Sequence, residues 1–117
     1  MPSDRMRRVD EAVREVLSDA VLGLKDPRVG FVTVTAVQTS PDLRHSRVFV
    51  SVLGTDSARR DTLDALEAAG GFLQGRVAAE LRLKRTPALA FLHDDTPERG
   101  ARIEALLQDA EPPDDEP

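Results

Sequence analysis

Near the start of the chain, hydrophobic residues recur at intervals of three and four positions. Between residues 6 and 24 they stand at Met6, Val9, Val13, Val16, Leu17, Ala20, Val21 and Leu24. This spacing aligns the side chains on one face of an α-helix. Ser3 or Asp4 can accept hydrogen bonds from the free N–H groups of the first turn, and Gly23 favours an exit. The pattern predicts an amphipathic helix over residues 6–24.

After Gly30 the pattern changes to the alternation that is typical of strands. Residues 31–38 read FVTVTAVQ. Strict alternation divides them between the two faces of a sheet, with Val32, Val34 and Ala36 on one face and Thr33, Thr35 and Val37 on the other. Residues 45–53, HSRVFVSVL, form a second such run. Ser40-Pro41-Asp42 between the runs favours a turn, so we expect an antiparallel hairpin with a loop of about four residues.

A longer helical pattern follows, over residues 58–83. At about 1.5 Å per residue it would extend for roughly 39 Å, which is too long for one straight helix in a domain of this size. Gly70 and Gly71 each cost about 1 kcal/mol relative to Ala in a helix, and they stand side by side. We therefore expect two helices joined at a kink at these glycines.

Residues 88–93, ALAFLH, predict a third strand. A right-handed crossover through the two helices makes this strand parallel to the second one. Thr96-Pro97-Glu98 is typical of a helix N-terminus and predicts a short helix that contains Ile103, Leu106 and Leu107. The expected fold class is α+β, in the order α-β-β-α-kink-α-β, with a three-stranded mixed sheet covered by helices on one face.

Composition restricts the classes of function. The chain has 117 residues, close to the usual size of one folding unit, and it contains no cysteine. Disulfides, thiolate metal sites and cysteine nucleophiles are therefore excluded. No apolar run reaches the roughly 20 residues of a membrane span, and the first residues lack the apolar segment of a secretory signal. We expect a soluble, cytoplasmic protein without a membrane partner.

The net charge of −5 argues against a nucleic-acid-binding protein until its distribution is considered. Five carboxylates lie near the end of the chain, at Asp109, Glu111, Asp114, Asp115 and Glu116. They account for the whole net charge, so residues 1–108 are neutral overall. We expect a folded domain over residues 1–108 and a disordered, acidic, proline-rich tail over residues 109–117. The tail either repels nonspecific RNA or is simply a solubilising end.

Candidates for catalysis are few. His93, Asp94 and Asp95, with Glu98 nearby, are the best cluster for metal binding or general-base chemistry. Successive strand residues point to opposite faces, however, so these adjacent side chains do not converge on one ion without a sharp turn. The serines lack the context of a nucleophile elbow, and there is no glycine-rich phosphate loop. We expect no enzyme, no metal site and no cofactor.

Candidate phosphate-binding residues form two groups. The first follows the kink: Ala69, Gly70, Gly71, Arg76, Arg82, Lys84 and Arg85. The second lies in the first helix: Arg5, Arg7 and Arg8. Small residues at a helix N-terminus, where N–H groups are free, suit a phosphate, and the cations can hold further phosphates. Close helix packing explains the glycines equally well, and a solvated helix face explains the arginines, so the spacing leaves both interpretations open.

Four segments of the chain, taken together and in order, indicate a protein family more specifically than any one of them does alone. They are RMRRVDEAVREVL with KDPRVGFVTVTAV, then TSPDLRHSRVFVSVLG, then LEAAGGFLQGRVAAELRLKRTPALAF, and finally HDDTPERGARIEALL. Together they resemble the ribosome-binding factor A family over nearly all of residues 5–107. The resemblance implies a type II KH-like fold, in which an Ala-x-Gly kink replaces the GXXG loop of other KH domains. Ala69-Gly70-Gly71 matches that kink.

The resemblance also implies a function and partners. Members of the family are non-enzymatic assembly factors that bind the immature small (30S) ribosomal subunit and its 16S rRNA during late maturation and rRNA processing, often with greatest importance in the cold. On this basis the two groups of residues above are the expected RNA-binding residues, and the free protein is expected to be a monomer. The alternative is a KH-like protein-interaction module that has lost RNA binding.

Overall fold

The computed structural model describes residues 3–96. The predicted helix after Thr96 and the predicted tail over residues 109–117 lie outside the described residues. The elements are α1 (Asp4–Leu22), β1 (Val32–Thr39), β2 (His45–Val52), α2 (Asp56–Ala68), α3 (Gly70–Glu80) and β3 (Ala88–His93). Their order confirms the predicted α+β arrangement.

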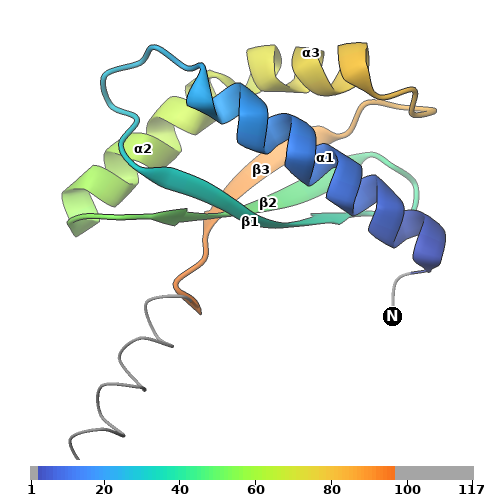
Figure 1. The fold of residues 1–117 in the computed structure, drawn as a ribbon, viewed down its shortest axis with the longest axis horizontal. Helices are drawn as coiled ribbons and strands as arrows, with labels where there is room; N and C mark the ends of the chain where they lie inside the picture. The colour runs from blue at the N-terminus through green and yellow to red at the C-terminus, as the bar shows by residue number, and fades with distance from the viewer. Residues whose placement is uncertain (1–2, 97–117) are drawn as a thin grey trace, which may run out of the picture.

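The three strands form one mixed sheet in the order β1-β2-β3. β1 pairs antiparallel with β2, and β2 pairs parallel with β3. A parallel pair needs a crossover connection, which α2 and α3 supply. All three helices lie on one side of the sheet (Figure 1). The predicted topology and the single helical layer are therefore confirmed.

The hydrophobic core lies between the helices and the sheet. Its fully buried members come from α1, β2, α2 and α3, and they include Val13, Leu17, Val48, Val50, Leu66, Leu73 and Val77. α1 begins where Ser3 accepts a hydrogen bond from the N–H of Met6 at 3.1 Å, and it ends at Gly23. These residues confirm the predicted cap, the predicted exit and the apolar stripe of the first helix.

The strict alternation predicted for β1 is wrong. Its buried residues are Val34 and Val37, at 4% and 6% exposed, while Ala36 is exposed. The register with β2 shifts between Val34 and Ala36, which leaves Thr35 as the extra residue of a β-bulge. One inserted residue moves every later side chain to the opposite face. Thr35 Oγ1 donates a hydrogen bond to Asp94 Oδ2 at 2.7 Å, which holds the bulge against the end of β3.

The long helical pattern is broken as predicted, but at Ala69 rather than at the glycines. Ala69 has a ψ of 6° and separates α2 from α3, while Gly70 and Gly71 are the first residues of α3. A Cβ placed on either glycine would have no neighbour within 4 Å. Close helix packing therefore does not explain these glycines, and the surface above them is open.

The second helix ends earlier than predicted, at Glu80 rather than near residue 83. Leu81 has extended backbone angles, with φ −118° and ψ 138°. Leu81 and Leu83 both pack against the core, and a two-residue spacing on one face requires an extended chain rather than a helix. Arg82 and Lys84 consequently point away from the core and are exposed.

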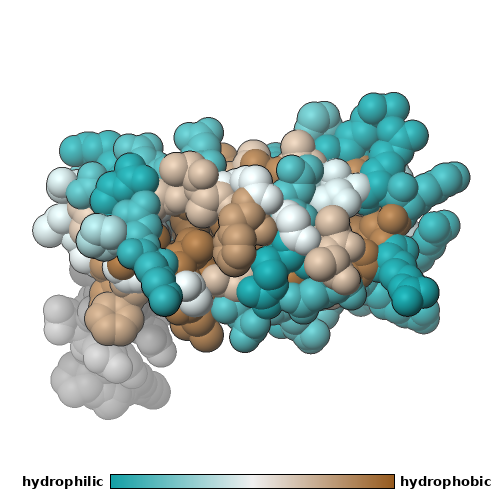
Figure 2. Space-filling model, turned by 90° about the horizontal axis from the view of Figure 1, so that it is seen from above, coloured by the Kyte–Doolittle hydropathy of each residue, from teal (hydrophilic) through white to brown (hydrophobic). Residues whose placement is uncertain are grey.

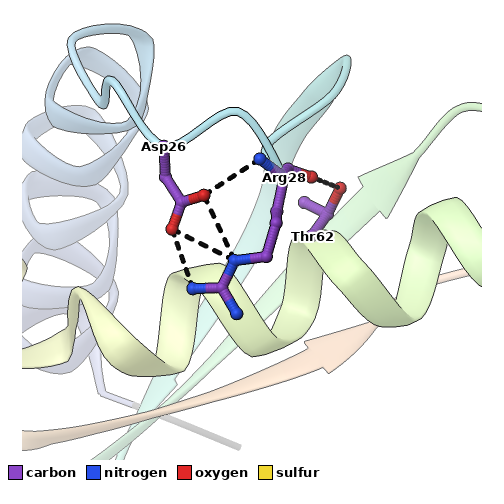
Figure 3. Close-up of polar contacts among 3 residues, drawn as sticks. All are labelled: Asp26, Arg28 and Thr62. Atoms are coloured by element: carbon purple, nitrogen blue, oxygen red, sulfur yellow. Dashed lines mark hydrogen bonds and ion pairs between the residues drawn. The ribbon is translucent and has the colours of Figure 1, made fainter.

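The loop between α1 and β1 is fastened to α2 by a buried threonine (Figure 3). Thr62 Oγ1 donates a hydrogen bond to the carbonyl of Arg28 at 3.2 Å and accepts one from the N–H of Gly30 at 3.2 Å. Asp26 accepts from the Arg28 N–H at 2.9 Å and pairs with its guanidinium at 2.8 Å. The hydrogen bonds from Arg28 lower the pKa of Asp26.

Candidate nucleic-acid interface

Three segments that are distant in the sequence meet at one end of the molecule. They are the first turn of α1, the turn between β1 and β2, and the loop between α3 and β3 (Figure 1). The N–H of Thr39 donates to Asp10 Oδ1 at 2.9 Å, which fastens the end of β1 to α1. The N–H of Ala88 donates to the carbonyl of Arg44 at 2.8 Å, which fastens the start of β3 to the turn. These bonds hold the three segments in fixed relative positions.

The three segments surround a hollow of about 710 Å³. Its lining residues are Ser3, Arg5, Met6, Val9, Pro41, Asp42, Leu43, Arg82, Leu83, Lys84 and Arg85. This volume lies within the range of roughly 300–1,000 Å³ that is usual for small-ligand sites. Hydrophilic side chains project from the same end of the molecule in Figure 2. The hollow brings together cations that the sequence placed in two separate groups.

The cations around the hollow have no carboxylate partner among the described residues. None of the four forms an ion pair within residues 3–96: Arg5, Arg82, Lys84 and Arg85. Asp42 is the one acidic residue of the lining, and its own turn satisfies it. Ser40 Oγ donates to Asp42 Oδ1 at 2.6 Å and the Arg44 N–H donates to it at 3.1 Å, which lowers the pKa of Asp42. The rim of the hollow is therefore strongly cationic.

Arg76 is placed differently from the cations of the hollow. Its guanidinium pairs with Asp19 of α1 at 2.9 Å and with Glu80 at 2.6 Å, and hydrogen bonds to Glu80 and Asp19 raise its pKa. These two pairs neutralise the charge and connect α3 to α1. The predicted grouping of Arg76 with the later cations is not found, because Arg76 serves as a clamp between two helices.

The remaining arginines of the first helix do not line the hollow. Arg7 pairs with Asp4, one turn earlier in α1. Arg8 is exposed and forms no ion pair within the described part of the chain. Arg5 is thus the member of this group that the fold brings to the second group.

The kink is a separate candidate element. α3 has 11 residues, so at about 1.5 Å per residue the kink lies roughly 15 Å from the loop after α3. Ala69 makes no side-chain cap hydrogen bond, and the first N–H groups of a helix have no acceptor within that helix. Phe72, in the same turn as Gly70 and Gly71, is 55% exposed. The structure does not bring Ala69, Gly70 and Gly71 to the hollow.

Sequence reasoning did not identify two residues: Leu43 at the hollow and Phe72 at the kink. Leu43 has a φ of 62°, and it is the one non-glycine residue between residues 3 and 96 with a positive φ. Nothing in the run SPDLRH indicates this conformation, which glycine and asparagine adopt more easily. The exposure of Phe72 could have been predicted, because Leu73 and Val77 form the buried face of this helix and Phe72 does not lie on that face.

The described part of the chain offers little for other kinds of site. Within residues 3–96, no helix is long and apolar enough to cross a membrane. The same residues contain no group of three or more His, Cys, Asp or Glu side chains that could hold a metal ion. Among the described residues, the cationic hollow and the exposed kink are the candidate features for a nucleic-acid contact.

The fold and this surface define an α+β domain of the KH-like class, with cations gathered at one end. The chain belongs to the ribosome-binding factor A family, whose sequence model matches residues 5–107. A ribosome-binding factor A from Halorhodospira halophila is 47% identical over 117 residues, covering 97% of this chain and 93% of the relative. One from Anaeromyxobacter sp. strain K is 51% identical over 110 residues, covering 92% of this chain and 79% of the relative.

Solved structures agree with this membership. The solution structure of a putative ribosome-binding factor A from Thermotoga maritima has a TM-score of 0.73 and 35% identity, covering 82% of this chain and 92% of that one. A homology model of the Thermus thermophilus ribosome-binding factor A, fitted into the cryo-EM map of a 30S complex of that factor, has a TM-score of 0.61 and 29% identity. It covers 73% of this chain and 90% of its own.

Proposed function

We propose that this protein is an assembly factor that binds the immature 30S subunit and contacts its 16S rRNA during late maturation and rRNA processing. It acts in the cytoplasm by binding rather than by catalysis. Family membership supports a ribosome-binding factor, and the related Thermus factor fitted into a 30S complex supports the small subunit as the partner.

One observation supports an RNA contact most directly: four cations converge around the hollow, and none of them has a carboxylate partner within residues 3–96. Arg5 comes from α1, whereas Arg82, Lys84 and Arg85 come from the loop after α3. Most other arginines of the described chain have a carboxylate partner close by, as Arg28 does in Asp26. Phosphate oxygens supply the missing negative charge, and phosphate contacts position a protein on RNA without reading its bases.

Sedimentation with small subunits tests the proposal. Purified protein is mixed with immature or mature small subunits and centrifuged at increasing salt concentration. We expect co-sedimentation with the immature subunits, and a steep loss of binding as salt rises, because each phosphate contact releases counterions. The double variant Arg82→Glu with Arg85→Glu should bind more weakly and unfold at the same temperature as the wild type.

The outcomes separate the alternatives. Binding that is insensitive to salt and to the double variant would favour a KH-like protein-interaction module without RNA contact. Equal binding to immature and mature subunits would contradict a role in assembly. Arg60→Glu is the matched control, because Arg60 of α2 is exposed, forms no ion pair within the described residues and lies outside the hollow.

A further inference from the structure

The hollow is not uniformly polar. Besides the four exposed cations, its lining includes four half-buried apolar side chains, which we call the floor: Met6, Val9, Leu43 and Leu83. A free phosphate is bound by charge and by hydrogen-bond donors, and it gains nothing from an apolar floor. The ligand that matches this surface combines negative charges with a flat group that has apolar faces.

Two of the floor residues are not explained by core packing. Val9 and Leu83 pack against the core, but Met6 and Leu43 do not belong to it. Leu43 also has a left-handed backbone, a conformation that recurs in the turns of β-hairpins. The N–H of Leu43 donates to the carbonyl of Ser40 at 2.9 Å, so the turn fixes the backbone of Leu43 beside the hollow.

We propose that this hollow binds one unstacked nucleotide of single-stranded RNA. The base lies on the floor formed by Met6, Val9, Leu43 and Leu83, and the flanking phosphates contact Arg5, Arg82, Lys84 and Arg85. The inference rests on the proposed RNA-binding function and adds to it the form of RNA that is recognised. Bases paired in a duplex are not exposed to such a floor, whereas unpaired bases can be turned outward.

The surroundings favour RNA over an acidic peptide. Three of the four rim cations are arginines, whose planar guanidinium groups bind phosphate oxygens in pairs and stack on bases. A second hollow of about 800 Å³ adjoins the first and shares Ser3, Met6 and Pro41 with it. Arg47 and His45 line the second hollow, which extends the path for a neighbouring nucleotide.

The test compares two short synthetic RNA strands of equal length and equal phosphate number, one with its bases and one abasic. Fluorescence anisotropy measures the affinity of the full-length protein for each strand. Contact between a base and a protein surface is worth about 1–3 kcal/mol on aromatic platforms. For a floor without aromatic rings we take the low end, so the abasic strand should bind about fivefold more weakly.

Two floor variants connect that difference to the hollow. Met6→Gln preserves the length and the helix propensity of the side chain. Leu43→Asn introduces a polar residue that readily adopts the left-handed backbone. Each should weaken binding of the strand with bases and leave binding of the abasic strand unchanged. Leu53→Gln is the matched control, because Leu53 is 71% exposed and lies outside the hollow. Thermal unfolding verifies that every variant is folded.

Four results are possible besides the expected one. Equal affinity for the two strands would overturn the nucleotide site while leaving RNA binding through phosphates intact. Variants that weaken both strands alike would also overturn it. An acidic peptide that binds more tightly than RNA, and depends on Met6 and Leu43, would assign the hollow to a protein partner. No binding of either strand would contradict the proposed RNA contact itself.

Discussion

Replacing Arg82 and Arg85 by glutamine removes two charges from the rim of the hollow without changing its floor. Both side chains are exposed, and neither forms an ion pair within the described residues. Glutamine retains polarity and introduces no repulsion. The free energy of unfolding should therefore stay close to that of the wild type, while binding of single-stranded RNA becomes weaker and less dependent on salt.

The size of the effect follows from the number of phosphates that the double variant can no longer neutralise. Each phosphate neutralised on a single strand contributes about 0.7 to the slope of log affinity against log salt concentration. With two phosphates fewer, the slope becomes shallower by about 1.4. Between about 50 and 200 mM salt, the wild type should therefore lose about sevenfold more affinity than the double variant.

Fluorescence anisotropy with a labelled single-stranded RNA, titrated at several salt concentrations, measures both slopes. Arg60→Gln is a control for a general loss of charge, because Arg60 lies on α2 outside the hollow. Arg76→Gln is a second control, because the partners of Arg76 are Asp19 and Glu80. Neither control should change the slope. An unchanged slope in the double variant, or an equal change in Arg60→Gln, would refute a localised cationic interface.

Further predictions concern the fold. Gly70→Ala should raise the free energy of unfolding by about 0.5–1 kcal/mol in urea denaturation, because its Cβ enters open space in a helix; a decrease would reveal a packing contact that the structure lacks. Thr62→Val should lower that free energy by about 1–3 kcal/mol, because the Gly30 N–H and the Arg28 carbonyl lose their partner; wild-type stability would argue against the clamp. The pKa of Asp26 is lower in the folded protein than in the unfolded chain. The ionised carboxylate therefore stabilises the fold at pH values above the ordinary pKa of Asp, about 3.9. This stabilisation is lost as the pH falls through the lower pKa of the folded state. The melting temperature of Asp26→Asn should therefore fall less on acidification than that of the wild type, and equal acid sensitivity would contradict the pairing with Arg28.

Hydrophobic periodicity predicted the elements of this fold well, because α1 and β2 each bury one face against a single core. It failed where two patterns fit the same residues. The alternation of Leu81, Arg82 and Leu83 is compatible with the last turn of a helix and also with an extended chain. Contact of both leucines with the core decides for the extended chain. The bulge at Thr35 was equally unreadable, because a strand of small and β-branched residues does not show where an extra residue enters.

The cations that line the hollow could be identified from the sequence, but their arrangement and the apolar residues beside them could not. The cations of α1 and of the region after α3 were identified, yet their meeting at one hollow depends on the turn between β1 and β2. Arg76 looked equivalent to Arg82 in the sequence. Its pairing with Asp19, 57 residues away, is a tertiary contact that no local pattern contains. The left-handed Leu43 likewise exists because of the turn geometry around Ser40.

Site-directed photocrosslinking on immature small subunits tests most directly whether the cationic end of the domain faces rRNA. A photoreactive amino acid replaces Lys84 in one protein and Arg60 in another, and the crosslinked partner is identified after irradiation. The probe at position 84 should crosslink to 16S rRNA, and the probe at position 60 should not. Crosslinks from position 84 to ribosomal proteins alone, or to rRNA from position 60 alone, would contradict the interface proposed for this protein.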